Sequence, residues 1–405
     1  MRSWTVNPSN IEVAGLENHS LRIFDSKTQR INLIPKQPEP IQIYVCGITP
    51  YDSAHLGHAF TYLAFDLMIR AMRVTKQNVN YVQNVTDIDD PLFERSRKTN
   101  KKWTSIVDDQ LEIYRKDMQA LNIMAPDHFV GVVENIDTIN DEIEKTIKRK
   151  LTYQLGTKWY FQTRKDNKSL LVKDVKDHEL ITLANERGCD TETPGKLNAI
   201  DPIVWKESKE DEPSWNREFG TGRPGWHIQC ISLANKYAKL PLHIQGGGKD
   251  LIFPHHAMCE EQAIALGLGD LATNYCHVGM VSYQGSKMSK SKGNLVFVHE
   301  LINKGISPMV IRTCLMLNHW QNDWEFQEVD IIKAEKLLEK INTNLTGKFF
   351  SRNEFDFILE SMLNNIQTPK ILEFLSQLDP DKNDERSVPT DTVLSALLGL
   401  DLESV

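Results

Sequence analysis

The chain has 405 residues, 40% of them hydrophobic and 25% charged, which is the composition of an ordinary folded protein of roughly two or three domains. Collagen-like, intrinsically disordered and disulfide-scaffold proteins are excluded, and no apolar run approaches the ~20 residues of a membrane helix. The start of the chain has no signal-peptide pattern and the net charge is −8, so we expect a cytoplasmic protein whose surface as a whole does not bind nucleic acid.

The first predicted elements form a strand–helix–strand unit. Residues 42–45 are an apolar run typical of a buried strand, and apolar residues recur at helical spacing over 58–73. Residues 79–85 predict a second strand, which ends in a polar stretch at 86–90. A strand, a helix and another strand in this order are typical of a parallel sheet, so the sequence predicts an α/β fold.

Two helices are predicted next, over about 104–121 and 131–148. The following region, 151–211, has strand-like runs at 158–162 and 170–172 among charged turns. We interpret it as an insertion into the sheet domain.

Strand patterns return at 240–245 and 276–281, which indicates that the chain re-enters the sheet after the insertion. Everything beyond 298 has helical spacing. The predicted helices there are 298–303, 308–318, 329–345 and 355–366.

Two histidines lie at the predicted strand-to-helix turn, in the segment His55-Leu56-Gly57-His58. The free N–H groups and dipole at the start of a helix favour phosphate, and Gly57 lets a ligand approach the backbone. In this interpretation His55 and His58 donate hydrogen bonds to phosphoryl oxygens. For the tetrapeptide alone, two surface histidines at a helix cap are the better explanation.

A lysine-rich loop follows a predicted strand further along the chain. Lys287-Met288-Ser289-Lys290-Ser291 lies between Gly285 and Gly293. Two lysines on a loop hinged by glycines can close over a triphosphate and neutralise the departing pyrophosphate. Taken alone, the pentapeptide is better explained as a lysine-rich surface loop.

Together and in this order, the two segments resemble the HIGH and KMSKS motifs of class I aminoacyl-tRNA synthetases. The resemblance implies a Rossmann-like catalytic domain in which an amino acid attacks the α-phosphate of ATP, giving an aminoacyl adenylate and pyrophosphate. It also implies catalytic roles for His55, His58, Lys287 and Lys290 in stabilising phosphate charge.

Cys46, Cys230 and His255 are candidate metal ligands. Two thiolates and one imidazole are a good set for Zn²⁺ and leave one position open. On spacing alone, however, two buried structural cysteines and an unrelated histidine are the better explanation. The segments around the three residues resemble the zinc-site segments of cysteinyl-tRNA synthetases, which implies that the substrate cysteine binds Zn²⁺ through its thiolate. Those enzymes have a glutamate ligand where this chain has Cys259, so Cys259 either completes the zinc shell or is a neighbouring thiol.

Two features separate the chain from a tRNA-charging enzyme. Only 114 residues follow Ser291, and from Arg352 onward eleven acidic residues stand against four basic ones, which is unsuited to binding RNA phosphates. In addition, Glu186–Thr191 (ERGCDT) resembles the ERGGDP segment of mycothiol-pathway cysteine ligases, and Val45–Asp52 fits these ligases as well. Cys189 and Thr191 depart from ERGGDP, so a plain charged turn remains an alternative for that segment.

The ligase resemblance implies that the chain joins L-cysteine to the amine of glucosaminyl-inositol, using ATP with Mg²⁺ and one Zn²⁺ per chain, and releases AMP. It implies a monomer with no membrane and no tRNA partner. A compact cysteinyl-tRNA synthetase and an inactive paralogue are the alternatives. The substrate- and adenylate-binding residues implied are Cys46, Gly47, Ile48, Thr49, Thr61, Asn84, Val85, Thr86, Trp226, Gly248, Lys249, Asp250 and Val281.

The expected architecture is α/β, a Rossmann-like class I synthetase catalytic domain with an inserted subdomain and a helical C-terminal region. We expect the first half of the catalytic domain at 1–120, the insertion at 121–215 and the second half at 216–296. The helical region with its acidic tail follows at 297–405.

Overall fold

A five-stranded parallel sheet forms the centre of the computed structural model, which describes residues 1–163, 169–288, 292–378 and 388–402. The strands lie in the order β12-β11-β3-β4-β5, and each neighbouring pair is parallel. Their bounds are β3 Ile41–Ile48, β4 Val79–Val85, β5 His128–Gly131, β11 Ile244–Gly248 and β12 Tyr275–Val278. The predicted α/β fold with a parallel sheet is confirmed.

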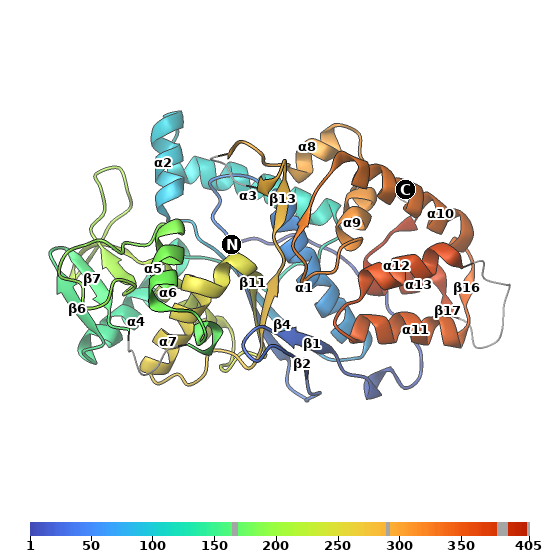
Figure 1. Cartoon of the computed structure of the whole chain (residues 1–405), viewed down its shortest axis with the longest axis horizontal. Coiled ribbons are helices and arrows are strands. Elements are labelled where there is room, and N and C mark those ends of the chain that lie inside the picture. Colours follow the sequence, from blue (N-terminus) through green and yellow to red (C-terminus); the bar gives the residue numbers. More distant parts are fainter. Residues whose placement is uncertain (164–168, 289–291, 379–387, 403–405) are drawn as a thin grey trace.

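Helices cover both faces of this sheet, and the alternation of side chains along β3 explains how (Figure 1). Ile43 and Val45 join the core cluster that contains helix α1 (Leu56–Val74). Tyr44 and Cys46 point the other way, into the cluster that contains α4 (Ile136–Lys148) and α6 (Trp226–Tyr237). Successive side chains of a strand lie on opposite faces, so a strand that is apolar throughout has to be buried on both.

A second sheet, antiparallel and also five-stranded, is inserted between the two halves of the parallel sheet, and it lies at the left of Figure 1. Its order is β6-β7-β8-β10-β9, with Trp159 of β7 opposite Trp205 of β8. The bounds are β6 Thr152–Leu155, β7 Lys158–Phe161, β8 Ile203–Lys206, β9 Trp215–Arg217 and β10 Gly220–Pro224, with α5 at Asp177–Glu186.

The remaining helices lie around the sheets. Helices α2 (Asp90–Thr99) and α3 (Trp103–Ala120) follow β4, and α7 (Ala257–Ala265) follows β11. A small sheet of β13 (Val281–Tyr283), β14 (Ser286–Lys287) and β15 (Trp324–Glu325) supports the lysine loop. The hairpin of β1 (Arg22–Asp25) and β2 (Arg30–Leu33) precedes the parallel sheet.

The C-terminal region is helical, as predicted, and it lies at the right of Figure 1. The described elements are α8 Val298–Asn303, α9 Pro308–Met316, α10 Glu328–Leu345, α11 Arg352–Leu363, α12 Thr368–Gln377 and α13 Thr390–Val393, with the short strands β16 Phe349–Phe350 and β17 Val388–Pro389. Asp66 of α1 joins this region to the sheet, because it pairs with both Arg70 and Arg312 and all three side chains are fully buried.

Several expected boundaries are wrong. Residues 170–172 form a 3-10 turn and not a strand, because the Ser169 side chain caps the Leu171 N–H. The strand expected from 240 begins at Ile244, since Pro241 has no N–H to donate to a neighbouring strand. The helix expected from 131 begins at Ile136, because the residues before it form β5.

The membership of strands in the two sheets also differs from the expected domain limits. Strand β5 lies beyond residue 120 but belongs to the parallel sheet, and β9 and β10 reach beyond residue 215 but belong to the inserted sheet. The insertion therefore begins after α4 and extends to Pro224. In contrast, the strand at Val79–Val85 and the helix at Val298–Asn303 have the predicted bounds.

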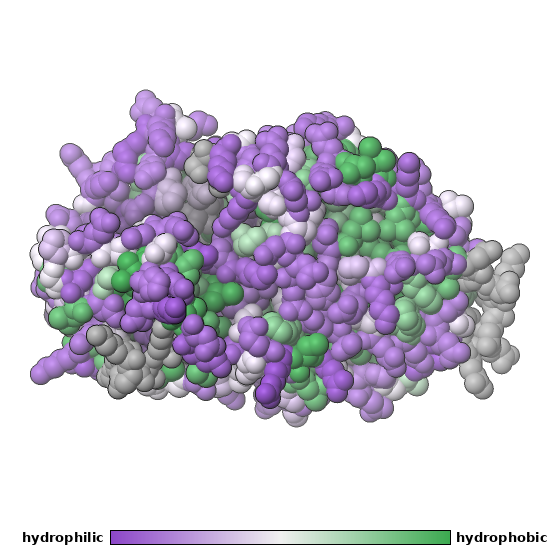
Figure 2. All heavy atoms as spheres, viewed as in Figure 1, coloured by the Kyte–Doolittle hydropathy of each residue, from purple (hydrophilic) through white to green (hydrophobic). Residues whose placement is uncertain are grey.

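Hydrophilic residues cover most of the face shown in Figure 2, and hydrophobic residues form separate patches on it. Within the ranges described above, no helix combines the length and the apolar character needed to cross a membrane.

Candidate active site

A cavity of about 1360 Å³ opens at the carboxyl ends of the central strands. Its walls include Cys46 and Gly47 at the end of β3, Asp89 after β4 and Gly248 at the end of β11. Open parallel sheets bind their ligands at this edge, because the loops there leave a crevice. Gly47 is needed at this point, since an added Cβ would lie 1.5 Å from the Asn84 carbonyl oxygen.

His55 and His58 lie side by side in the cavity wall, with ring centroids 3.9 Å apart. His55 caps helix α1, and its Nδ1 accepts a hydrogen bond from the Gly57 N–H at 3.1 Å. Burial is the main cause that lowers the pKa of both imidazoles, to about 4 for His58 and well below the usual value for His55. A neutral His55 that accepts at Nδ1 carries its proton on Nε2, which can therefore donate to a phosphoryl oxygen.

Lys287, on β14, reaches the same cavity and forms an ion pair with Asp250, with Nζ 2.9 Å from Oδ2. Burial alone would raise the pKa of Asp250, but the ammonium of Lys287 holds it below its usual value. The first lysine of the loop is therefore directed toward the two histidines. Lys290, the second expected lysine, lies outside the described residues.

Of the three candidate metal ligands, Cys46 lines the cavity, whereas Cys230 and His255 are buried and are not among its lining residues. Cys46 Sγ lies 3.2 Å from His256 Nε2, and Cys259 Sγ lies 4.0 Å from His255 Nε2. The Cys230 thiol is in hydrogen-bond contact with Cys46. The sequence analysis missed His256, although it is the second histidine of the same Phe-Pro-His-His segment.

The donor set in this cluster fits a metal ion. Cys46, His255 and His256 offer one sulfur and two ring nitrogens within 4.8 Å of one another, and His227, His255 and Cys259 form a second such group. All of these side chains are buried, and burial, followed by contact with Cys230, raises the pKa of the Cys46 thiol well above its usual value. A bound cation would reverse this effect, because a metal displaces the thiol proton.

The residues expected to line the adenylate pocket fall into two groups. Most of them line the cavity: Cys46, Gly47, Thr49, Thr61, Trp226, Gly248, Asp250 and Val281. Ile48, Asn84, Val85, Thr86 and Lys249 are not among its lining residues. Asn84 instead accepts a hydrogen bond from the Gly47 N–H at 3.0 Å, and Lys249 pairs with Asp323 at 3.0 Å.

Trp226 and the ERGCDT segment form further parts of the wall. The Trp226 ring stacks on His255, with centroids 4.1 Å apart and planes at 18°. Arg187, Gly188, Cys189 and Asp190 line the cavity, and Arg187 donates to the Phe253 carbonyl at 2.8 Å. The segment therefore lies in the cavity wall. Thr191 is not among the lining residues, and its hydroxyl donates to the Asn185 side chain.

Sequence reasoning missed several lining residues, among them Asp52, Asp89, Asp90 and Gln229. Asp89 and Asp90 lie in the polar stretch that follows β4. Their position at the carboxyl end of a strand was therefore an available signal. Gln229 has no such signal, because it lies within a helix between two buried apolar residues.

Comparisons with known proteins agree with this geometry. Residues 32–336 match the model of the tRNA synthetases class I (C) catalytic domain. A protein of Thermomonospora curvata named L-cysteine:1D-myo-inositol 2-amino-2-deoxy-alpha-D-glucopyranoside ligase is 42% identical over 343 residues, 84% of this chain and 83% of its own. The ligase of the same name from Brachybacterium faecium is 37% identical over the whole of both chains.

Among solved structures, Mycobacterium tuberculosis methionyl-tRNA synthetase in complex with methionyl-adenylate has a TM-score of 0.58 and 16% sequence identity. The match covers 83% of this chain and 81% of that one. At this identity the likeness concerns the fold, and it confirms the expected class I synthetase architecture.

Proposed function

The chain belongs to the family of the class I (C) tRNA synthetase catalytic domain, and from this premise we propose that it is an ATP-dependent ligase that joins L-cysteine to the amine of glucosaminyl-inositol in mycothiol biosynthesis. End-to-end similarity to ligases of that name supports this reaction. The observation that carries the proposal is a single cavity in which the two histidines and Lys287 lie above a buried cluster of cysteines and histidines.

In the first half-reaction, a carboxylate oxygen of cysteine bonds to the α-phosphorus of ATP and pyrophosphate leaves. His55 Nε2–H donates to a phosphoryl oxygen, and the Lys287 ammonium neutralises the negative charge of the leaving group. These groups are fixed in place before the reaction, so they stabilise developing charge without reorganising. We assign Lys290 the same role as Lys287.

In the second half-reaction, the amine nitrogen of glucosaminyl-inositol bonds to the carbonyl carbon of the cysteinyl adenylate. The bond from that carbon to the phosphate oxygen breaks, AMP leaves and the nitrogen loses a proton. The protein contributes mainly by holding the amine and the carbonyl in contact, at roughly 3–3.5 Å.

The buried group of Cys46, His255 and His256 supports a metal site, and we assign Zn²⁺ to Cys46 and His255 together with Cys230, although Cys230 is in neither of the two donor groups found among the described residues. Zinc with three protein ligands supplies an open position for the substrate thiolate, which a serine hydroxyl fills far less well. Trp226 would fix the orientation of the His255 ring by stacking, and His256 would orient Cys46 through their 3.2 Å contact. Cys259 Sγ lies 3.6 Å from the His227 carbonyl and 4.0 Å from His255 Nε2, and it forms a second donor group with these two histidines.

All six cysteines are free thiols, which suits a reducing compartment, and we place the enzyme in the cytoplasm.

The proposal is tested by incubating the purified protein with L-cysteine, ATP, Mg²⁺ and glucosaminyl-inositol. We expect one amide product, one AMP and one pyrophosphate per turnover, and no product when cysteine is replaced by serine. ATP consumption without amide formation would contradict the ligase assignment.

A further inference from the structure

The cavity is larger than one substrate requires. Pockets for a single small ligand are typically about 300–1,000 Å³, whereas this cavity measures about 1360 Å³. His58, Lys287 and Asp250 mark its phosphate end. The opposite wall is formed by the start of helix α2 and by strands β8 and β10 of the insertion, and nothing in the first half-reaction uses it.

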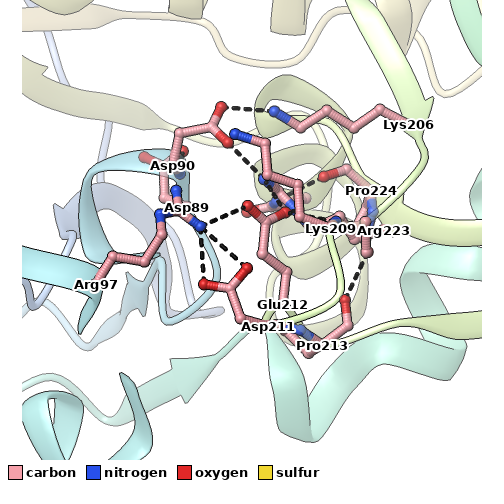
Figure 3. Close-up of polar contacts among 12 residues, drawn as sticks. Asp89, Asp90, Arg97, Lys206, Lys209, Asp211, Glu212, Pro213, Arg223 and Pro224 are labelled. Atoms are coloured by element: carbon pink, nitrogen blue, oxygen red, sulfur yellow. Dashed lines mark hydrogen bonds and ion pairs between the residues drawn. The ribbon is translucent and has the colours of Figure 1, made fainter. Parts of the chain in front are cut away.

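A network of ion pairs fixes this second wall (Figure 3). Asp90 pairs with Lys206 at 2.6 Å and also with Arg223. Arg223, which is 3% exposed, forms a second pair with Glu212 at 2.9 Å. Asp90 begins helix α2, which follows β4 of the parallel sheet, whereas Lys206 and Arg223 belong to β8 and β10 of the insertion. The network therefore joins the insertion to the parallel-sheet domain at this end of the cavity.

Two side chains in the walls have an oxygen atom without a hydrogen-bond donor among the described residues. Gln229 is 2% exposed, its Nε2 donates to the Pro224 carbonyl at 3.3 Å, and its Oε1 has no partner. Asp89 is partly buried, and its Oδ1 accepts the Asp90 N–H at 2.9 Å. Among the described residues, no hydrogen bond reaches the other oxygen of Asp89. The unpartnered Gln229 Oε1 is buried, which costs free energy, and the second Asp89 oxygen can still accept a hydrogen bond. This end of the cavity is therefore suited to a ligand that carries N–H or O–H groups.

We propose that this second wall is the acceptor subsite, where Asp89 binds the ammonium of the amino sugar and Gln229 Oε1 accepts a hydrogen bond from the same molecule. The inference rests on the proposed function and specifies where its second substrate binds. A hydroxyl-rich cationic ligand complements the site, because a carboxylate favours the ammonium and an amide oxygen favours any neutral donor.

The surroundings of Asp89 are consistent with this role. Burial raises the pKa of its carboxyl, and the Lys206 and Arg223 cations nearby act in the opposite direction. A carboxylate in such a setting binds the incoming ammonium and can take its proton before the neutral amine attacks the adenylate.

The test measures the two half-reactions separately in Asp89→Asn and Gln229→Met. Asparagine is as good a helix cap as aspartate, so the substitution removes charge without removing the cap of α2. We expect the KM for glucosaminyl-inositol to rise about 10- to 100-fold in Asp89→Asn, as for a lost hydrogen bond to a charged group. Gln229→Met should raise it about 3- to 10-fold. Cysteine-dependent pyrophosphate exchange should stay within about twofold of wild type in both variants.

Asp211→Asn is the matched control, because Asp211 belongs to the same ion-pair network through Arg97 but does not line the cavity. It should leave both half-reactions unchanged. An unchanged KM for the amino sugar in Asp89→Asn, or an equal loss of pyrophosphate exchange, would overturn the acceptor subsite. Failure of the wild-type protein to form any amide would instead overturn the proposed function, so the two failures are distinguishable.

Discussion

Asp250 forms an ion pair with Lys287 in the cavity wall, with Nζ 2.9 Å from Oδ2, and thereby joins strand β14 to the residues that follow strand β11. The pair holds the Lys287 ammonium close enough to His58 to act on its imidazole before any ligand binds. Preorganised charge of this kind is the main way in which an enzyme stabilises a phosphoryl-transfer transition state.

We therefore predict that Asp250→Asn lowers the rate of cysteine-dependent pyrophosphate exchange about 10- to 100-fold, because the Lys287 ammonium loses its anchor. Asp323→Asn is the control, since Asp323 pairs with Lys249 outside the cavity wall. It should exchange at nearly the wild-type rate. Equal rates for Asp250→Asn and wild type would show that the ion pair is not needed.

The assigned zinc ligands predict the effect of removing each of them in turn. Cys46→Ala, Cys230→Ala and His255→Ala should each lose bound zinc and abolish adenylate formation, since removing a ligand opens the shell and frees the substrate thiol. Zinc content by elemental analysis and pyrophosphate exchange are the two measurements. Cys314→Ala is the control, because Cys314 is buried on helix α9, away from the cluster.

Cys259→Ala separates the two roles left open for that residue. Full zinc content with near-normal exchange would show a neighbouring thiol. Loss of zinc would show a fourth ligand. If the variants of Cys46, Cys230 and His255 all kept their zinc, the whole cluster assignment would be wrong.

The sequence predicted those parts of the site that are marked by short motifs or by local hydrophobic periodicity. The βαβ unit, His55, Lys287 and Cys46 are recognisable because hydrophobic periodicity and short motifs are local in the chain. The insertion was recognised as a region, but its five strands are only three to five residues long, and β7 pairs with the distant β8, with Trp159 opposite Trp205. Periodicity cannot register such short strands, so the antiparallel sheet was not predicted.

The missed site residues have physical explanations as well. Asp89 and Gln229 acquire their roles only when the insertion folds back against helix α2, through pairs such as Asp90 with Lys206. Lys249 was expected in the pocket because of the family resemblance, but its long side chain turns outward to Asp323. Side-chain direction after a turn depends on tertiary partners that the local sequence does not specify.

Burial of His58 predicts how stability depends on pH. Its pKa is lowered to about 4 in the folded protein, whereas the unfolded chain titrates near 6.5. Below pH 6.5 the unfolded state binds the extra proton, so the free energy of unfolding should fall as pH decreases from 6.5 toward 4. The effect of this one residue is at most about 3 kcal/mol.

Denaturant unfolding at pH 7.5, 6.0 and 5.0 measures this effect. His58→Gln should be less sensitive to pH over the same interval than wild type. In the wild-type protein, the rate of pyrophosphate exchange should show no inflection near pH 6.5 that is caused by His58, since its imidazole is neutral on both sides of that pH. A wild-type inflection at that pH, absent in the variant, would contradict a neutral His58.

The buried Arg312 predicts a purely structural effect. It pairs with Asp66 and donates to the Leu398 and Leu121 carbonyls, each at 2.7 Å, so it joins helices α1 and α9 to the end of the chain. Arg312→Met leaves Asp66 with Arg70 as its only cationic partner and should destabilise the fold by about 3–5 kcal/mol. Urea unfolding measures this loss. Lys333→Met, which breaks an exposed pair with Asp330, should cost less than about 1 kcal/mol.

The central claim, that the adenylate is transferred to an amino sugar, is tested most directly by single-turnover transfer from preformed cysteinyl adenylate. The loaded enzyme is mixed either with glucosaminyl-inositol or with cysteine-specific tRNA, and the amide and the charged tRNA are quantified over time at two salt concentrations. We predict rapid amide formation with little dependence on salt and no charging of tRNA, because a small acceptor requires positioning and not a basic surface. Rapid, salt-sensitive charging of tRNA with no amide product would contradict the ligase assignment and identify a compact synthetase instead.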